Sequence, residues 1–250
     1  MQCVLLAAGY ATRLYPLTEN MPKALLKLGD KTILDMVVEK IDEIDDVENI
    51  YVVTNERFYK NFVDWAEAHK GKKPVEVIND HTTTNDNRKG AIGDLKYVID
   101  LKGIDDEILV MASDNIFDFS LNDFVDIYRE KNCDMICANR IENYEDLHAM
   151  GVAELGEDGK VLGFEEKPEK PKTDLGVSPF YLYKKDTVPM VGQYLQEGNN
   201  PDAPGHFIPW LIGQKPVYAY VFDAVRIDIG TPESYYDALD RLEKGTLFRN

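Results

Sequence analysis

The sequence is organised around Leu5-Leu6-Ala7-Ala8-Gly9-Tyr10-Ala11-Thr12-Arg13-Leu14-Tyr15-Pro16-Leu17-Thr18, which is followed by Pro22-Lys23-Ala24-Leu25-Leu26. An apolar run leads directly into a turn of small residues, and one arginine and one lysine come after the turn. A backbone with little side-chain bulk at the end of a buried strand can wrap an anion. The planar guanidinium of Arg13 suits bridging contacts to phosphate oxygens, and Lys23 suits a point charge. The alternative is a surface loop that carries two solvated cations.

The first half of the sequence alternates short apolar runs with helical patterns. Strands are predicted over Cys3–Ala7, Asn49–Thr54, Pro74–Ile78, Glu107–Ala112 and Asp134–Asn139, and helices over Thr32–Ile44, Phe58–His69, Gly90–Leu101 and Leu121–Arg129. This alternation is typical of βαβ units, so we expect an α/β fold with a mostly parallel central sheet and helices on both faces.

The second half has a different pattern, in which turn residues separate consecutive strand-like runs. Strands are predicted over Gly151–Leu155, Val161–Phe164, Gly176–Tyr183 and Val217–Phe222, and helices over Asp186–Leu195, Phe207–Leu211 and from Thr231 to Leu242. This pattern predicts a smaller antiparallel layer. The sequence has no internal repeat and no linker, so we expect a single domain over residues 1–250 with two functional lobes, approximately 1–140 and 141–250.

Charge and cysteine usage exclude several classes of protein. The formal net charge is −17, which disfavours nonspecific binding to nucleic acid or to an anionic membrane. There are three cysteines, Cys3, Cys133 and Cys137. The Cys133/Cys137 spacing has no His or Cys companion nearby, which disfavours a zinc site, and an odd number of cysteines fits a reducing compartment. No signal peptide and no run of membrane-spanning length is expected. These features predict a cytoplasmic enzyme or binding protein, and they leave the oligomeric state open, a homo-oligomer included.

Two aspartates follow apolar strands and are candidates for a metal site. Asp114 comes after the run Ile108–Ala112, and Asp228 alternates with apolar neighbours so that it shares a strand face with Arg226. Two carboxylates that converge on one cation from separate strands are a common magnesium arrangement, in which substrate phosphates complete the coordination. The alternatives are a turn or helix cap for Asp114 and a buried Arg–Asp pair for Asp228.

Two further polar stretches lie at expected strand ends. The loop from Asn79 to Gly90 is polar throughout and precedes a helix, and long loops in compact domains are often functional. Glu166 and Lys167 follow the strand Val161–Phe164, and they suit hydroxyl and phosphate recognition or, alternatively, a solvated strand end. The carboxyl ends of strands in an open α/β sheet are where ligands bind.

Taken together, these motifs resemble the sugar-phosphate nucleotidylyltransferase family. The family pattern Gly-x-Gly-Thr-Arg-Leu-x-Pro-x-Thr followed by Pro-Lys-x-Leu is similar to Gly9–Thr18 and Pro22–Leu25. The strand ending at Ser113-Asp114, the Glu166-Lys167-Pro168 element and Asp228-Ile229-Gly230-Thr231-Pro232 follow in the family order and extend over nearly the whole chain. The resemblance implies a GT-A-like nucleotidyltransferase fold, in which the first lobe binds the nucleotide and the antiparallel layer in the second binds the sugar phosphate.

The resemblance also implies a role for each matching residue. The catalytic residues would be Arg13 and Lys23, and Asp114 and Asp228 would hold Mg²⁺. The nucleotide would be bound by Ala8, Gly9, Tyr10, Ala11 and Thr12, with Asn79 and Gly90 as candidate base contacts. The sugar phosphate would be bound by Gly151, Glu166, Lys167, Gly176 and Val177. The substrates would be a nucleoside triphosphate and a sugar 1-phosphate.

Two departures from the family pattern concern the loop and the base. Ala11 replaces the second glycine of the loop. If the position needs a positive φ, alanine costs about 1 kcal/mol of strain, whereas alanine serves if only a small side chain is needed. The loop after Asn79 lacks the usual glutamine pattern, and Thr84-Asn85 resembles relatives that activate phosphocholine or unusual sugars.

The sequence therefore predicts a magnesium-dependent transfer of a nucleotidyl group from a nucleoside triphosphate to a sugar 1-phosphate, with release of pyrophosphate. The alternatives are a cytidylyltransferase that acts on phosphocholine and a non-catalytic nucleotide or sugar-phosphate sensor on the same fold. Catalytic decay would be expected to remove Arg13, Lys23 or one of the two aspartates, and all four are present. A glycosyltransferase would need an Asp-x-Asp motif, which Ser113-Asp114-Asn115 does not provide.

Overall fold

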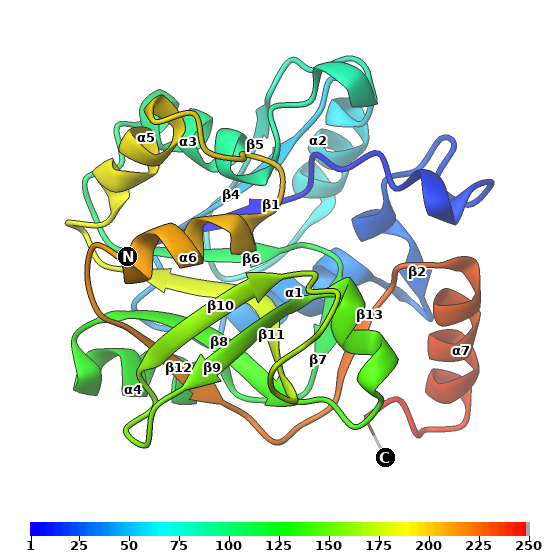
Figure 1. Ribbon diagram of the computed structural model, residues 1–250. Coiled ribbons are helices and arrows are strands. Elements are labelled where there is room, and N and C mark those ends of the chain that lie inside the picture. Colours follow the sequence, from blue (N-terminus) through cyan, green and yellow to red (C-terminus); the bar gives the residue numbers. More distant parts are fainter. Residues whose placement is uncertain (249–250) are drawn as a thin grey trace. The chain divides into compact units, whose positions relative to one another are not determined.

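The computed structural model describes residues 1–248 (Figure 1). The chain divides into two compact units. Unit 1 consists of Met1–Gln2, Lys89–Met111 and Asn122–Asp223, and unit 2 consists of Cys3–Arg88, Ala112–Leu121 and the chain from Ala224 onward. Each unit is thus assembled from segments that lie far apart in the sequence.

Unit 2 contains a group of parallel strands, two short two-stranded ribbons and three α-helices. Its strands are β1 (Gln2–Leu6), β2 (Lys27–Leu28), β3 (Lys31–Thr32), β4 (Asn49–Thr54), β5 (Val75–Asn79), β7 (Asn115–Phe117) and β13 (Arg226–Asp228). Its helices are α1 (Ile33–Ile41), α2 (Tyr59–Ala68) and α7 (Pro232–Glu243), with 3-10 turns η1 (Thr12–Leu14), η2 (Lys23–Leu25) and η3 (Asn85–Asn87). The strands β1, β4 and β5 are neighbours in that order, and β4 and β5 run parallel. Because α2 lies between β4 and β5 in the sequence and these two strands run parallel, this part confirms the predicted βαβ arrangement.

Local sequence signals place the ends of two helices in unit 2. Thr32 forms a capping box with Asp35: the Thr32 Oγ1 accepts from the Asp35 amide at 3.0 Å, and the Asp35 carboxylate accepts from the Thr32 amide at 2.8 Å. Thr231 caps α7 in the same way, with Pro232 at the first helical position, as the sequence predicts. The two caps fix where the chain enters each helix.

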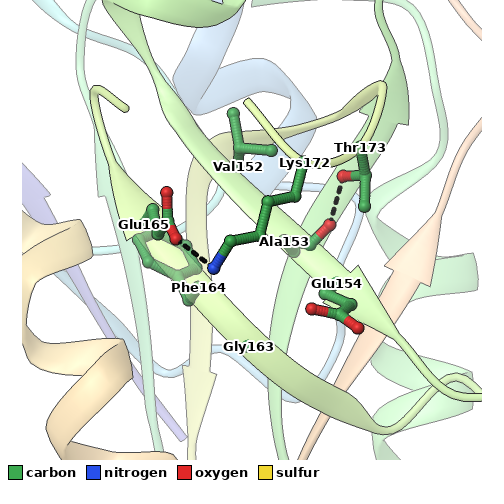
Figure 2. Close-up of a pocket in the computed structure, with 8 residues that line it drawn as sticks. All are labelled: Val152, Ala153, Glu154, Gly163, Phe164, Glu165, Lys172 and Thr173. Atoms are coloured by element: carbon green, nitrogen blue, oxygen red, sulfur yellow. Dashed lines mark hydrogen bonds and ion pairs between the residues drawn. The ribbon is translucent and has the colours of Figure 1, made fainter. Parts of the chain in front are cut away.

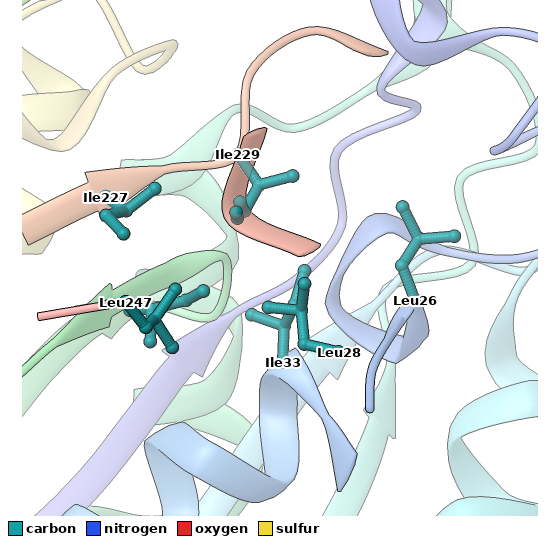
Figure 3. Close-up of a cluster of buried hydrophobic side chains, with 8 residues drawn as sticks. Leu26, Leu28, Ile33, Ile227, Ile229 and Leu247 are labelled. Carbon is teal, nitrogen blue, oxygen red and sulfur yellow. The ribbon is translucent and has the colours of Figure 1, made fainter. Parts of the chain in front are cut away.

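A cluster of buried aliphatic side chains joins the late strand β13 to the early part of the chain (Figure 3). Ile227 and Ile229 flank Asp228 and pack in this cluster with Leu26, Leu28 and Ile33. Burial of such side chains contributes roughly 1.5–3 kcal/mol each. The alternation along β13 therefore leaves Asp228 on the exposed face while its neighbours anchor the strand.

Unit 1 contains the remaining strands and four helices. Its strands are β6 (Ile108–Ala112), β8 (Asp134–Arg140), β9 (Gly151–Leu155), β10 (Val161–Glu166), β11 (Leu175–Tyr183) and β12 (Val217–Val221). Its helices are α3 (Ala91–Lys102), α4 (Leu121–Lys131, which begins in unit 2), α5 (Val188–Gln196) and α6 (Phe207–Ile212), with 3-10 turns η4 (Tyr144–Ala149) and η5 (Pro204–His206). The strand order is β10-β9-β11-β6, and β8 pairs with both β11 and β12. The β9–β10 and β9–β11 pairs are antiparallel, which confirms the predicted antiparallel layer and, with unit 2, the α/β fold class.

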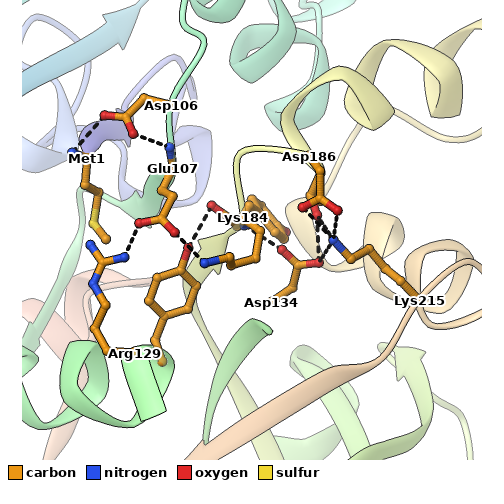
Figure 4. A network of polar contacts seen from close by, with 11 residues as sticks. Met1, Asp106, Glu107, Arg129, Asp134, Lys184, Asp186 and Lys215 are labelled. Atoms are coloured by element: carbon orange, nitrogen blue, oxygen red, sulfur yellow. Dashed lines mark hydrogen bonds and ion pairs between the residues drawn. The ribbon is translucent and has the colours of Figure 1, made fainter. Parts of the chain in front are cut away.

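A network of ion pairs connects charged side chains within unit 1 (Figure 4). The fully buried carboxylate of Asp134 accepts from the Lys184 amide at 2.6 Å, from Thr187 Oγ1 at 2.7 Å and pairs with Lys215 at 3.2 Å. Burial raises the pKa of Asp134 despite these partners. Buried carboxylates need such partners, because an unpaired buried charge costs several kcal/mol.

Candidate active site

The predicted phosphate loop follows β1 and has one residue in a strained backbone conformation. Ala11 stands in the left-handed region with φ 47° and ψ 41°, immediately before η1. The buried hydroxyl of Thr18 donates to the Ala11 carbonyl oxygen at 2.8 Å and holds the loop in this conformation. The position therefore needs the positive φ that favours glycine, which decides between the two alternatives that the sequence left open.

Side chains at neighbouring strand ends hold the carbonyl oxygens that lead into this loop. Ser113 Oγ donates to the Leu6 oxygen at 2.9 Å, and Asn55 Nδ2 donates to the Ala8 oxygen at 2.9 Å. Thr54 Oγ1 donates to the carbonyl oxygen of Ala7 at 3.3 Å. Carbonyl oxygens that pointed toward a phosphate would repel it, so fixing them elsewhere leaves the amide groups as the polar face of the loop.

Asn55, which is not among the predicted site residues, makes a second contact. Its Oδ1 accepts from the Phe58 amide at 3.1 Å, so one fully buried side chain connects the phosphate loop to the start of α2. The sequence contained a signal, because Asn55 follows directly after the strand Asn49–Thr54, as Asn79 and Asp114 follow theirs. The side chain of Tyr10 is also held in place, because its buried hydroxyl donates to the Thr82 carbonyl oxygen at 3.2 Å. A ligand at the loop would therefore contact the backbone of Tyr10.

The two predicted catalytic cations have different surroundings. Arg13 is exposed and makes no hydrogen bond or ion pair with any residue between 1 and 248. Lys23 Nζ lies 2.8 Å from Asp114 Oδ2 and 3.2 Å from Asp228 Oδ1. Burial lowers the pKa of Lys23, but the charges and hydrogen bonds of both aspartates outweigh it and raise the pKa above its ordinary value. Lys23 is therefore a permanent cation at neutral pH.

The antiparallel β7–β13 ribbon brings the two predicted metal ligands to one place. Its register pairs Asp228 with Asn115, which is the residue after Asp114. Asn115 Nδ2 donates to Asp114 Oδ1 at 2.8 Å, and Asn115 Oδ1 accepts from the guanidinium of Arg226. Asp228 is exposed and contacts Lys23, and Arg226 contacts Asn115.

The carboxylate pair is a set of hard oxygen donors of the kind that Mg²⁺ prefers. No group of three or more His, Cys, Asp or Glu that could hold a metal ion occurs among the residues that the structure describes. Mg²⁺ usually takes one or two protein carboxylates and fills its remaining positions with water and substrate phosphates. Asp114 and Asp228, with side chains 31% and 55% exposed, leave room for such additional ligands.

The two candidate base contacts have structural partners in their own units. In unit 2, Asn79 Nδ2 donates to Glu56 Oε2 at 2.7 Å and Asn79 Oδ1 accepts from the His81 amide at 2.8 Å. In unit 1, Gly90 has φ 80°, and a Cβ at this position would lie 2.4 Å from the Pro201 carbonyl oxygen. The backbone contact alone is a sufficient reason for glycine at position 90.

Glu166 and Lys167 lie at the end of β10 in unit 1. The Glu166 carboxylate is half-buried and accepts no hydrogen bond from any described residue. Burial raises its pKa, and the charges of Lys167 and His206 act in the opposite direction. Lys167 has a positive φ of 51°, so the chain turns sharply directly after Glu166. A half-buried carboxylate without donors is suited to accept hydrogen bonds from a ligand.

Gly205, which is not among the predicted site residues, makes room for this carboxylate. A Cβ at position 205 would lie 1.9 Å from Glu166 Oε2 and 3.1 Å from the Phe164 ring. Gly205 is in η5, far from β10 in the sequence, so no local pattern could reveal the contact.

The predicted acceptor-site glycines are also closely packed. A Cβ on Gly151 would lie 2.4 Å from the Phe164 ring, and one on Gly176 would lie 2.5 Å from Met150 Sδ. Val177 pairs with Gly151 across β11 and β9, and Gly151 pairs with Glu166 across β9 and β10. The antiparallel register thus places Val177, Gly151 and Glu166 in one row across three strands.

A small cavity near this row is not a substrate site (Figure 2). It has a volume of ≈ 20 Å³ and is lined by residues of β9 and β10 together with Lys172 and Thr173. Lys172 pairs with Glu165, and Thr173 Oγ1 donates to the Ala153 oxygen at 2.6 Å. This volume has room for about one water molecule.

Comparison with known proteins identifies the protein family to which the chain belongs. The model of a protein family described as nucleotidyl transferase matches residues 2–245. The chain belongs to the nucleotidyl transferase family. It is a nucleotidyltransferase enzyme, and the resemblance to sugar-phosphate nucleotidylyltransferases that the motifs indicated is confirmed.

Two curated relatives of the nucleotidyltransferase differ in length. The UTP–glucose-1-phosphate uridylyltransferase AglF of Haloferax volcanii is 29% identical over 248 residues, which cover 98% of each chain. The bifunctional protein GlmU of Methanocaldococcus jannaschii is 27% identical over 240 residues, and the match covers 95% of this chain but 53% of that protein. The chain thus spans nearly the whole length of one relative and about half of the other.

A solved structure confirms the nucleotidyltransferase fold. The UDP-glucose pyrophosphorylase complexed with UDP-glucose superposes with a TM-score of 0.81 at 21% identity and covers 98% of both chains. At this identity the likeness concerns the fold alone. Within residues 1–248, no helix has the length and apolar character needed to cross a lipid bilayer.

Proposed function

We propose that this nucleotidyltransferase transfers a nucleotidyl group from a nucleoside triphosphate to a sugar 1-phosphate in a magnesium-dependent reaction. The observation that carries the proposal is the convergence of Lys23, Asp114 and Asp228 in the same unit as a loop whose carbonyl oxygens are held away by Ser113 and Asn55. In this proposal unit 2 binds the triphosphate and unit 1 binds the acceptor.

The phosphate loop supplies the binding site for the triphosphate. The amides of Gly9–Thr12 would donate to phosphate oxygens, and a Cβ at Gly9 would meet nothing within 4 Å, so this side of the loop is open. The free guanidinium of Arg13 would bind the β and γ phosphates in a bidentate manner. Lys23 would neutralise charge at the reacting phosphates.

Asp114 and Asp228 would hold Mg²⁺, which supplies Lewis-acid stabilisation of charge on the phosphate oxygens when bound. Asp228 lies in β13 and Asp114 directly precedes β7, so the pairing of these two strands keeps the spacing of the carboxylates fixed. Asn115 maintains the orientation of Asp114 through the 2.8 Å hydrogen bond.

The chemistry is an in-line displacement. An oxygen of the acceptor phosphate forms a new bond to the α-phosphorus, the bond between the α-phosphorus and the bridging oxygen breaks, and pyrophosphate leaves with that electron pair. A sugar phosphate is already an anionic nucleophile at neutral pH, so positioning and charge stabilisation are the main requirements. Glu166 would accept hydrogen bonds from hydroxyl groups of the acceptor, and Lys167 would pair with its phosphate.

The three cysteines are free thiols, and two of them are buried, which supports a cytoplasmic location with reducing conditions. Burial raises the pKa of Cys3 well above its ordinary value, so this thiol is an inert packing group.

The test is a pyrophosphate-release screen of the purified protein. Each nucleoside triphosphate is combined with a panel of sugar 1-phosphates and with phosphocholine, with and without Mg²⁺. We expect pyrophosphate release with at least one sugar 1-phosphate, and this release should depend on Mg²⁺. It should be abolished in Asp114→Asn and Asp228→Asn but retained in the exposed control Asp30→Asn. Release with phosphocholine alone, or undiminished release in both aspartate variants, would contradict the proposal.

A further inference from the structure

Lys23 lies between the two side chains that are proposed to bind the metal. Its ammonium group is 2.8 Å from Asp114 Oδ2 and 3.2 Å from Asp228 Oδ1, and only 13% of the side chain is exposed. Lys23 is therefore itself the counter-ion of this carboxylate pair.

An ammonium group and a divalent cation compete for these two oxygens. Mg²⁺ binds carboxylate oxygens at about 2.1 Å, so an ion on both oxygens would lie within a few ångströms of Nζ. The repulsion between the two cations over such a distance is large, even at an effective dielectric constant of about 20. The contacts of Lys23 must be given up before both oxygens can bind a metal.

Lys23 is the member of the cluster that is able to move. Asp114 is held by Asn115, and Asp228 is fixed in the β13 register between the buried residues Ile227 and Ile229. The lysine ammonium is carried by a flexible four-carbon stem, and no described residue other than the two aspartates binds it. Displacement therefore costs the two ion pairs and leaves the carboxylates in place.

We propose that Lys23 is a positioning residue for the metal ligands. In the nucleotide-free enzyme Lys23 holds Asp114 and Asp228 in register and keeps divalent cations out. Lys23 releases the two aspartates when the triphosphate offers its ammonium group another anionic partner. This inference rests on the proposed function, because it takes the aspartate pair as the metal site. Metal binding and triphosphate binding are then positively coupled, and each strengthens the other by the same factor.

The experiment measures Mn²⁺ binding to the nucleotide-free protein by the loss of the free-ion electron paramagnetic resonance signal. Wild type is compared with Lys23→Met, which keeps the stem and removes the charge, and with Lys31→Met as a matched control. Lys31 is in the same unit and pairs with Glu39 at 2.7 Å, with both side chains about half exposed. Lys23→Gln serves as a second variant, and circular dichroism confirms that each variant is folded.

We expect Lys23→Met and Lys23→Gln to bind Mn²⁺ roughly tenfold or more tightly than wild type, on the scale of changes to groups beside metal ligands. Lys31→Met should bind as wild type does, and adding Asp228→Asn to Lys23→Met should remove the gain. Equal Mn²⁺ affinity in wild type and both Lys23 variants would overturn the inference, as would an equal gain in Lys31→Met.

The Mn²⁺ titration and the pyrophosphate-release assay together separate this inference from the proposed function. If wild type shows Mg²⁺-dependent pyrophosphate release but the Lys23 variants gain no Mn²⁺ affinity, the positioning role alone is wrong. If wild type releases pyrophosphate equally well without any divalent cation, the metal assignment is wrong and the inference falls with it.

Discussion

Thr18 donates a hydrogen bond from its buried hydroxyl to the carbonyl oxygen of Ala11 at 2.8 Å, and Ala11 stands in the left-handed region with φ 47°. A residue that carries a Cβ is strained there by about 1–2 kcal/mol. The hydrogen bond from Thr18 offsets this strain and keeps the phosphate loop in its shape.

Ala11→Gly should relieve the strain, although glycine also makes the unfolded chain more flexible by roughly 0.4–1 kcal/mol. We expect the free energy of unfolding to stay the same or to rise by up to about 1 kcal/mol, and turnover to be similar or higher. Thr18→Val should raise the KM for the triphosphate more strongly in wild type than in the Ala11→Gly background, because glycine adopts the conformation without help. Urea unfolding and steady-state kinetics of the four proteins check both statements, and an equal effect of Thr18→Val in the two backgrounds would contradict the coupling.

Asn55 gives a second prediction about the same loop. In Asn55→Ser the short hydroxyl can still accept the Phe58 amide, as serine does at helix starts, but it cannot reach the Ala8 carbonyl. We expect the KM for the triphosphate to rise roughly tenfold or more from the misplaced loop, while the KM for the acceptor changes little. Asn61→Ser, at a more accessible asparagine in α2, is the control. A variant that loses stability but keeps its triphosphate KM would show that Asn55 is only structural.

Much of the fold could be predicted because its signals are local. The strands Asn49–Thr54 and Gly151–Leu155 have the predicted bounds, and the Thr231 cap and Pro232 begin α7 as expected. Apolar periodicity and capping residues act within a few positions of the chain, so one sequence is sufficient to read them.

The contacts that organise the site depend on long-range packing instead. The strands β7 and β13 have three residues each and pair across more than a hundred positions, so no local pattern reveals that they pair with each other. The same pairing places Asp114 and Asp228 where both contact the ammonium group of Lys23. The contact of Gly205 with Glu166 likewise joins η5 to β10 and has no local signal.

Glu166 and Gly205 give a prediction for the acceptor side. A carboxylate accepts hydrogen bonds at both oxygens only when it is ionised, and burial raises the pKa of Glu166. Acceptor affinity should therefore fall as the pH is lowered through this raised pKa, and it should recover above it. Glu166→Gln should raise the acceptor KM and remove this pH dependence, with the triphosphate KM unchanged.

Gly205→Ala tests the space around the same carboxylate. Its methyl group would lie 1.9 Å from Glu166 Oε2, so the side chain must move away. We expect an increase in the acceptor KM similar to that of Glu166→Gln, and no further increase when the two are combined. Gly198→Ala is the control, since a Cβ there meets nothing within 4 Å, although its φ of 80° adds some strain. Additive effects of Gly205→Ala and Glu166→Gln would contradict a shared cause.

The ion-pair network of unit 1 gives a prediction about acid stability (Figure 4). Glu107 accepts from Lys184 Nζ at 2.6 Å and pairs with Arg129, and its side chain is 16% exposed. Burial raises the pKa of Glu107, but the hydrogen bonds from Lys184 and Arg129 outweigh it, so the pKa lies below its ordinary value. A carboxylate with a lowered folded-state pKa stabilises the fold above its unfolded-state pKa, and the contribution is lost as the pH falls through the folded-state value.

Glu107→Gln should therefore lower the free energy of unfolding at neutral pH by roughly 1–3 kcal/mol, because the two cations lose their anionic partner. The difference from wild type should shrink as the pH falls below about 4.3, where the glutamate of the unfolded chain becomes protonated. Urea unfolding at a series of pH values measures it. Glu39→Gln, which breaks the exposed Lys31–Glu39 pair, should cost less than about 1 kcal/mol at neutral pH. Parallel stability curves for wild type and Glu107→Gln down to pH values where glutamate is protonated would show that the paired charge does not contribute to acid sensitivity.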